Sequence, residues 1–262
     1  ECSYGCGEID HQGYSYSTII IGDQCWFAEN CRYHPSLSPL NEGSATDPHY
    51  YDLEYNGIGG DHHGVLYNWA AVMTEDVCPS GWHIPSDEEW QTMEMSLGMS
   101  ESEATSVGWR GIDEGYKMKS TSGWNNNGNG DNSSGFNALP GGSIINGGFN
   151  YYGNYGDWWT SSESGVGSWL RTLKHSEFNV RRGDDYRKNG FSTRCVTEQL
   201  IVLISGCTDD QACNFNENAV EDDGSCEYIT PVDLGDDIET CEESVTLDAG
   251  DGYDSYLWST GE

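Results

Sequence analysis

Basic residues are scarce in this chain, whose 262 residues include 11 Lys and Arg against 44 Asp and Glu, for a net charge of −33. Binding to nucleic acid needs clustered Lys and Arg to neutralise phosphates, so the composition argues against that role. Long apolar runs are also missing, since the longest, Leu200–Ile204, is far shorter than the ~20 residues of a membrane-spanning helix. The sequence opens at Glu1 with neither an initiator Met nor a cationic, apolar leader, so we expect a processed or partial product.

The common short catalytic motifs are absent as well. No GxSxG, HExxH or phosphate-binding loop occurs in the sequence. Three histidines stand near acidic residues, but His62 and His63 are adjacent and diverge on any regular element, and His83 follows Trp82, which we expect in the core. We therefore expect a non-catalytic protein.

Ten cysteines are spread along the chain without the paired CxxC motifs of a zinc site. Cys2 and Cys6 form a close pair, but no second pair follows at zinc-finger distance. Disulfides are the better interpretation, and they place the protein in an oxidising compartment, outside a cell or in a periplasm. The aromatic content of 12% argues against disorder, because these side chains can build a core.

Charge divides the chain near residue 197. Residues 1–197 carry 26 acidic and 11 basic residues, whereas residues 198–262 carry 18 acidic residues and no basic one. We expect a first domain over residues 1–197, which is long enough for its own core. Two short modules are expected to follow it, at residues 198–229 and 230–262.

Helix signals are few in the first domain, which predicts the α+β class with a large share of loops. Ser86 followed by Glu89 is a capping box, and apolar residues then recur at helical spacing. Two further helices are predicted over residues 64–74 and 100–107. The remainder is predicted to form short strands joined by loops. These loops are rich in Gly and Asn, above all in residues 124–155.

Six motifs follow one another in the first domain. They are a Tyr-rich segment (Gly13–Tyr33), YNWAAV (Tyr67–Val72), CPSGWHIPSDEEW (Cys78–Trp90), GFNALPGG (Gly135–Gly142), DWWTSSES (Asp157–Ser164) and GFSTRCV (Gly190–Val196). In content and order they resemble the Fibrobacter succinogenes major paralogous domain of secreted Bacteroidota surface proteins, over about residues 6–197. The resemblance implies a C-type-lectin-like fold with two helices, a small twisted antiparallel sheet and long loops. It also implies export by a type IX route.

The same resemblance implies the disulfides of this domain. A bond between Cys78 and Cys195 would close about 117 residues and stabilise the fold by roughly 4–5 kcal/mol in the chain-entropy account. Two cysteines depart from the family pattern: the family's ENL motif is ENC here, which introduces Cys31, and the further cysteine Cys2 stands near the start. We expect these two cysteines to pair with each other. The expected pairs are Cys78–Cys195, Cys6–Cys25 and Cys2–Cys31.

Residues 206–228 are acidic and rich in Asn. The segment resembles a short adhesin repeat that is likened to calcium-binding thrombospondin type 3 repeats. Oxygen donors at two-residue steps suit Ca²⁺, which takes 6–8 oxygen ligands, although the Gly and Glu of an EF-hand loop are missing. The alternative is an acidic, Asn-rich loop without an ion. Cys207 is expected to pair with Cys226, which leaves Cys213 without an obvious local partner. The expected calcium ligands are Asp209, Asn214, Asn216, Asn218, Asp222 and Asp223.

Residues 231–262 resemble the opening strands of an immunoglobulin-like repeat of Bacteroidota surface proteins. Their apolar residues alternate as they do in sandwich strands. About 32 residues are too few for a sandwich of roughly 100 residues. We therefore expect a truncated β-sandwich with more chain beyond it, which would hold any partner of Cys241.

The sequence thus predicts a non-catalytic, secreted cell-surface adhesin or recognition module of a larger multi-domain protein, stiffened by Ca²⁺. Two alternatives stay open, a glycan-binding lectin domain and a structural subunit of an extracellular fibre or stalk. The EPN and QPD triplets of calcium-dependent lectins are absent, but aromatic and amide side chains suit glycans. The expected partners are a surface glycan or protein and the adjacent domains of the same polypeptide. The candidate ligand contacts are Trp124, Asn126, Tyr152, Tyr155 and Trp159.

Overall fold

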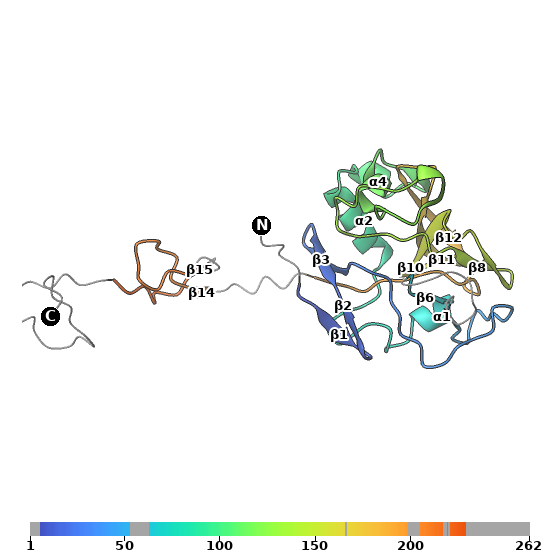
Figure 1. The fold of residues 1–262 in the computed structure, drawn as a ribbon, viewed down its shortest axis with the longest axis horizontal. Helices are drawn as coiled ribbons and strands as arrows, with labels where there is room; N and C mark the ends of the chain where they lie inside the picture. Colours follow the sequence, from blue (N-terminus) through green and yellow to red (C-terminus); the bar gives the residue numbers. More distant parts are fainter. Residues whose placement is uncertain are drawn as a thin grey trace, which may run out of the picture. The chain divides into compact units, whose positions relative to one another are not determined.

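The computed structural model describes residues 6–52, 63–165, 167–198, 205–216, 219 and 221–228. The chain divides into two units, Glu1–Gln199 and Leu200–Glu262, close to the boundary expected at residue 197. The first unit is α+β, as predicted, with small antiparallel sheets and short helices (Figure 1). The expected immunoglobulin-like module at residues 230–262 lies outside the described residues.

The largest sheet has four antiparallel strands in the order β10-β11-β12-β7 (Figure 1). Strands β10 and β11 form a long hairpin, and β12 places the short strand β7 at the edge. The register of β10 against β11 shifts between Trp159 and Glu163, which marks a bulge. The strand bounds are β10 (Tyr155–Ser164), β11 (Gly167–Lys174), β12 (Val180–Asp185) and β7 (Gly108–Arg110).

A second sheet, in the order β13-β4-β3, brings the two ends of the first unit together. Val196 of β13 pairs with Trp26 of β4, so residues 170 positions apart in the sequence lie side by side. The three strands are β13 (Val196–Glu198), β4 (Gln24–Phe27) and β3 (Thr18–Ile21).

Three two-stranded pairs complete the sheets described in the first unit. They are β1 (Ile9–His11) with β2 (Tyr14–Tyr16), β5 (Tyr50–Asp52) with β6 (Val65–Tyr67), and β8 (Ser143–Ile145) with β9 (Gly148–Asn150). The Tyr-rich segment of residues 13–33 thus forms the three strands β2, β3 and β4.

The capped helix is confirmed as α2 (Asp87–Ser96). The Ser86 hydroxyl accepts a 3.1 Å hydrogen bond from the Glu89 N–H, and the Glu89 carboxylate accepts a 2.7 Å bond from the Ser86 N–H. Gly98, with φ of +120°, follows the helix end, where a residue without a Cβ is favoured. The predicted helix at residues 100–107 is shorter than expected and forms α3 (Glu101–Ala104).

The helix predicted over residues 64–74 is wrong. Val65–Tyr67 forms β6, whose side chains are all buried, and the helix α1 (Trp69–Val72) begins only after it. Asn68 separates the two, because its side-chain oxygen accepts a 3.0 Å hydrogen bond from the Ala71 N–H and caps the helix. The short helices α4 (Glu114–Met118) and η1 (Asn125–Asn127) were not predicted.

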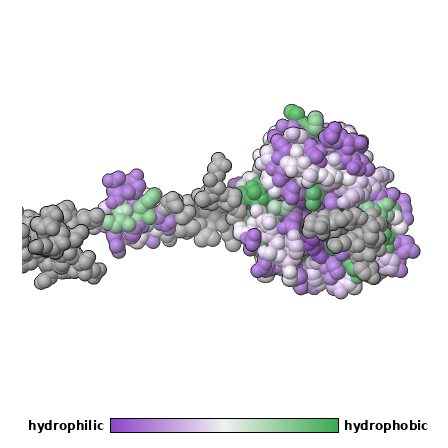
Figure 2. Space-filling model, viewed as in Figure 1, coloured by the Kyte–Doolittle hydropathy of each residue, from purple (hydrophilic) through white to green (hydrophobic). Residues whose placement is uncertain are grey.

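Aromatic side chains fill the core. Trp26, Trp90, Phe136 and Trp158 pack edge to face, with Trp26 and Trp90 ring centroids 5.1 Å apart. A second cluster is built around Tyr67, Trp159 and Phe191. By contrast, the visible face of the first unit is mostly hydrophilic, with small scattered hydrophobic patches (Figure 2).

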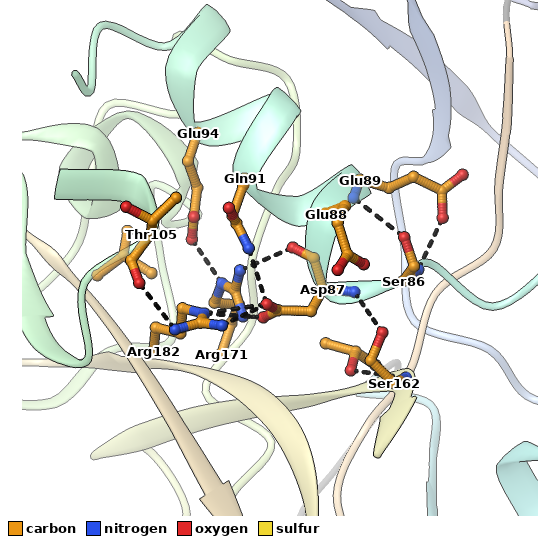
Figure 3. A network of polar contacts seen from close by, with 12 residues as sticks. Ser86, Asp87, Glu88, Glu89, Gln91, Glu94, Thr105, Ser162, Arg171 and Arg182 are labelled. Carbon is orange, nitrogen blue, oxygen red and sulfur yellow. Dashed lines mark hydrogen bonds and ion pairs between the residues drawn. The ribbon is translucent and has the colours of Figure 1, made fainter. Parts of the chain in front are cut away.

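A buried ionic cluster fixes α2 to one face of the four-stranded sheet (Figure 3). Arg171 binds two acidic residues of the helix, with its Nη1 2.7 Å from Asp87 Oδ1 and its Nε 2.8 Å from Glu94 Oε1. Arg182 pairs with Asp87, and Arg110 pairs with Glu94. Burial acts to raise the pKa of Asp87, but its bonds to Arg182 and Arg171 outweigh burial and lower that pKa.

The disulfides among the described residues are Cys6–Cys25, Cys78–Cys195 and Cys207–Cys226, three of the pairs expected from the sequence. Multiple disulfides are typical of extracellular proteins. No helix in the described part of the chain is long and apolar enough to cross a membrane.

The expected Cys2–Cys31 pair is not formed, because Cys31 carries a free, fully buried thiol. Its side chain is turned into the core, where its sulfur lies 3.5 Å from the sulfur of Cys195. Cys2 itself is outside the described residues. Cys213 is a free cysteine on the surface.

In the second unit, β14 (Ser205–Gly206) pairs in parallel with β15 (Glu221–Asp222) next to the Cys207–Cys226 disulfide.

Candidate functional site

The face of the four-stranded sheet that points away from α2 carries a row of polar and aromatic side chains. Residues paired directly across neighbouring strands share a face of the sheet. Asp157 pairs with Thr172, Thr172 with Arg181, and Arg181 with Trp109. The row therefore crosses the sheet from β10 to β7. The alternate residues Trp158, Arg171 and Arg182 point to the opposite face, toward α2.

A cavity of about 290 Å³ lies over this row, and we call it the sheet-face cavity. Four aromatic side chains line it: Trp109 at 39% exposure, Tyr151 at 53% exposure, Tyr155, and the buried Phe191. The Tyr151 and Tyr155 rings lie 5.1 Å apart and are tilted toward each other. Lys174 also lines the cavity, with its Nζ 5.8 Å from the centre of the Tyr155 ring. The volume is at the lower end of the range for small-molecule pockets.

Asp157 lines the base of the cavity and is almost fully buried. Burial raises the pKa of its carboxyl to about 7, although the hydrogen bond from Thr172 and the charge of Arg181 both act to lower it. The Thr172 hydroxyl donates this 2.7 Å bond to Asp157 Oδ1. At neutral pH the carboxyl is therefore present in both forms, able to donate or to accept a hydrogen bond from a ligand.

Arg181 lies flat across Gly183 in the same strand. A Cβ at Gly183 would stand 2.5 Å from Arg181 Nη1, so a glycine is required there for the guanidinium to adopt this position. No ion pair or hydrogen bond of the described residues involves the Arg181 guanidinium, whose five N–H groups remain available to a ligand. Asp185, two residues after Gly183, adds a second carboxylate to the cavity wall.

The family model of the Fibrobacter succinogenes major domain (Fib_succ_major) matches residues 19–197. The chain belongs to this family. The match extends from β3 to β13 and so includes the four-stranded sheet and its cavity. No curated protein and no solved structure matches the chain.

Two of the ligand contacts predicted from the sequence are wrong, because Trp124 and Trp159 are core residues of the Fib_succ_major domain. The Trp124 indole N–H donates a 3.0 Å hydrogen bond to the Ala138 carbonyl. The Trp159 indole N–H donates a 2.8 Å bond to the Tyr67 carbonyl. Both rings are shielded from any external ligand.

The other three predicted contacts are on or near the surface. Asn126 is exposed in η1, with φ of +54°. Tyr152 is partly exposed, and its ring lies 6.0 Å from that of Phe149. Of the five predicted contacts, Tyr155 lines the sheet-face cavity.

The sequence interpretation missed Trp109, Asp157, Thr172 and Arg181 as a group. Alternation along residues 181–185 indicates that Arg181 and Asp185 share a face. It does not indicate that Trp109, from a strand more than 70 residues earlier, is the next neighbour in the row. The pairing of β7 with β12 is the missing signal, and it depends on tertiary structure.

His83 has structural contacts in the Fib_succ_major domain. Its backbone pairs with that of Val196, and its ring Nε2 lies 2.6 Å from the carboxylate of Glu89, which forms the capping box of α2 with Ser86. These contacts tie the segment before α2 to β13. His62 lies outside the described residues.

In the second unit, expected calcium ligands are bonded to their own loop. The Asp209 carboxylate accepts a 2.6 Å hydrogen bond from the Tyr228 hydroxyl, and the Asn214 side-chain oxygen accepts a 2.8 Å bond from the Glu227 N–H. Asn218 lies outside the described residues. Within the part that the structure describes, no three His, Cys, Asp or Glu side chains are grouped so that they could hold a metal ion. Two further expected ligands, Asp222 and Asp223, each accept a hydrogen bond from the backbone N–H group two residues later in the chain. The calcium site stays a prediction.

Proposed function

We propose that the Fib_succ_major domain is an extracellular, non-catalytic recognition module that binds a carbohydrate in the sheet-face cavity. The observation that carries this proposal is the meeting of partly exposed aromatic rings with a polar base. Trp109 and Tyr151 present ring surface to solvent, and Asp157, Thr172 and Arg181 lie beneath them.

Both halves of this arrangement suit a sugar. The apolar C–H face of a pyranose ring packs against an aromatic ring, as the amphipathic surfaces of Tyr and Trp allow. Its hydroxyl groups require donors and acceptors at fixed positions, since polar groups left unpaired in a pocket weaken binding. Arg181 offers donors, Asp185 offers acceptors, and the Asp157 carboxyl offers either.

The charges around the cavity favour a neutral sugar. The positive charges of Lys174 and Arg181 are offset by Asp185 and by the ionised fraction of Asp157. A strongly anionic ligand would meet both carboxylates, and it would be repelled at a distance by a chain of net charge −33. A neutral hexose avoids both effects.

The scaffold holds the cavity in a fixed shape. The opposite face of the same sheet is bound to α2 through the ionic cluster of Asp87, Glu94 and their three arginines. Groups held in place before binding lose little conformational entropy when the ligand arrives. This rigidity supports a recognition site on the sheet, bordered by Tyr151 of the segment between β9 and β10.

We place this module in a larger secreted surface adhesin, a setting that the three disulfides support. A C-type-lectin-like classification is part of the proposal, supported by the pairing of β4 with β13 near the two ends of the domain. The calcium-stiffened connector is also part of it, and calorimetry with Ca²⁺ at millimolar levels tests that element.

Glycan-array binding by the purified chain tests the proposal. We expect binding to neutral glycans that falls at least tenfold in Tyr151→Ala. The matched control is Tyr186→Ala, since Tyr186 is an exposed tyrosine that does not line the cavity. Equal binding by both variants, or no binding to any glycan, would reject the carbohydrate site.

A further inference from the structure

Three sulfur atoms are gathered in the core near the start of the CPSGWH segment. Cys78 and Cys195 form a disulfide, and the free thiol of Cys31 lies 3.5 Å from the sulfur of Cys195. A thiol in van der Waals contact with a disulfide is positioned for thiol–disulfide exchange, in which a thiolate attacks one sulfur and displaces the other. This site is separate from the sheet-face cavity.

The backbone fixes this proximity. The Cys31 N–H donates a 3.0 Å hydrogen bond to the Thr193 carbonyl, and the Phe27 N–H donates a 3.0 Å bond to the Cys195 carbonyl. The segments that carry Cys31 and Cys195 are therefore held together at two points, next to the pairing of β4 with β13. A shift of about 1.5 Å brings the two sulfurs from 3.5 Å to the ~2.05 Å of a disulfide.

The three cysteines differ in their access to solvent. Cys31 and Cys195 are fully buried, whereas Cys78 borders an open cavity of about 780 Å³, which we call the Cys78 cavity. As long as Cys78 is paired with Cys195, the free thiol of the trio is hidden. If the bond moves to Cys31, the free thiol is the one at the cavity wall.

We propose that Cys31 exchanges with the Cys78–Cys195 disulfide and thereby makes Cys78 an attachment site for a disulfide-bearing partner. In the first step the Cys31 thiolate forms a bond to the Cys195 sulfur, the Cys78–Cys195 bond breaks, and the proton of Cys31 ends on Cys78. The number of disulfides is unchanged, so the step needs no oxidant or reductant. In the second step the Cys78 thiolate attacks an external disulfide, forms a mixed disulfide, and releases one half of that molecule as a thiol.

Charge selects the external disulfide. The wall of the Cys78 cavity carries the acidic residues Glu8, Asp10, Glu75 and Asp76. A cationic disulfide is attracted to this wall, and an anionic one is repelled. We therefore infer that the partner presents positive charge beside its disulfide.

Burial makes the first step slow. It raises the pKa of the Cys31 thiol to about 12, so the reactive thiolate is scarce at neutral pH, and the nearby Arg194 offsets the effect only in part. The charged and titratable groups around this thiol are Arg194, Glu29, Tyr16 and Tyr67. The attachment site is accordingly latent, and it becomes reactive over a long incubation.

Incubation of the full chain with cystamine, followed by non-reducing peptide mapping, tests the inference. We expect a cysteamine adduct on Cys78 together with a Cys31–Cys195 disulfide. Glutathione disulfide, which is anionic, should label Cys78 at least tenfold more slowly. Cys213, which is exposed and free, reports reagent activity in the same digest.

Two variants complete the design. Cys31→Ser should abolish labelling of Cys78 and leave the Cys78–Cys195 disulfide intact. Cys78→Ser, incubated with cystamine as the oxidant, should yield a Cys31–Cys195 disulfide with release of two molecules of cysteamine, which also shows that the second bond can form in the folded chain. The inference is overturned by an adduct on Cys31, by Cys31 paired with Cys2, by unlabelled Cys78 in the wild-type chain, or by a free Cys195 in Cys78→Ser.

Discussion

Thr172 and Asp157 face each other across β11 and β10, and the Thr172 hydroxyl donates a 2.7 Å hydrogen bond to the Asp157 carboxylate. This bond lies at the base of the sheet-face cavity. It places a carboxyl with a pKa of about 7 where a ligand would meet it. The cavity therefore changes its hydrogen-bonding character within the physiological pH range.

Replacement of Asp157 should alter the pH dependence of stability. The pKa of Asp157 is about 7 in the folded chain and about 3.9 in an unfolded one, so folding is favoured by protonation. This contribution is fully present below pH ~4 and is lost as the pH rises toward 7. We expect the stability of Asp157→Asn relative to wild type to increase by roughly 2–3 kcal/mol between pH 5 and pH 8, measured by urea denaturation at each pH.

Asp23→Asn is the control for this experiment, since Asp23 is exposed in the turn between β3 and β4. It should show no such pH-dependent difference. Equal stability of Asp157→Asn and wild type at both pH values would contradict the raised pKa of this carboxyl.

The ionic cluster should give the folding stability a pH dependence opposite to that of Asp157. The pKa of Asp87 is lowered in the folded chain, so its contribution is present above pH ~4 and is lost as the pH falls through the folded value. Asp87→Asn leaves Arg171 and Arg182 short of a buried partner and should lower the unfolding free energy by about 3–5 kcal/mol at pH 7. Glu88→Gln, on the exposed side of the same helix, should change it by less than ~0.5 kcal/mol. A similar effect of both substitutions on the denaturation midpoint would rule out a dominant role for the cluster.

The long-range disulfide should stabilise the domain more than the short one. Cys78 and Cys195 are 117 residues apart, whereas Cys6 and Cys25 are 19 apart. Loop-closure entropy predicts a loss of roughly 4–5 kcal/mol for the double replacement of the first pair by Ser and about 3 kcal/mol for the second. Thermal melting of both double variants measures the order. A larger loss for the Cys6–Cys25 pair would contradict this account.

Two tryptophans should separate binding from folding. Trp109 is partly exposed at the sheet-face cavity, so Trp109→Ala should lose glycan affinity and keep most of its stability. Trp124 is buried, so Trp124→Ala should lose about 3–5 kcal/mol of stability. Calorimetric titration and thermal melting of both variants make the comparison. Loss of affinity in a fully folded Trp124→Ala together with normal affinity in Trp109→Ala would restore the loop site predicted from the sequence.

Local signals in the sequence were sufficient for part of the fold. The capping box at Ser86 fixes where α2 begins, because a side chain and a backbone N–H three residues apart satisfy each other. The helix predicted over residues 64–74 failed because Val65–Tyr67 is apolar on both faces. Periodicity alone does not distinguish a fully buried strand from a helix.

The candidate site was harder to predict from the sequence than the helix boundaries. An aromatic residue in an Asn-rich loop can face solvent or the core. Trp124 faces the core, where its indole N–H donates a hydrogen bond to a backbone carbonyl. The row that ends at Trp109 depends on the register of β7 against β12. Such pairings between distant segments have no local signature. The family resemblance supplied the domain and the pairing of Cys78 with Cys195, but not the cavity.

A titration of the isotopically labelled chain with a neutral sugar, selected from the glycan array and followed by two-dimensional amide NMR, tests the central claim most directly. The account predicts saturable shifts concentrated in residues 155–157, 172–174 and 181–185, and in the Trp109 side-chain N–H. Saturable shifts confined to residues 124–129, or a complete absence of shifts at millimolar sugar, would contradict it.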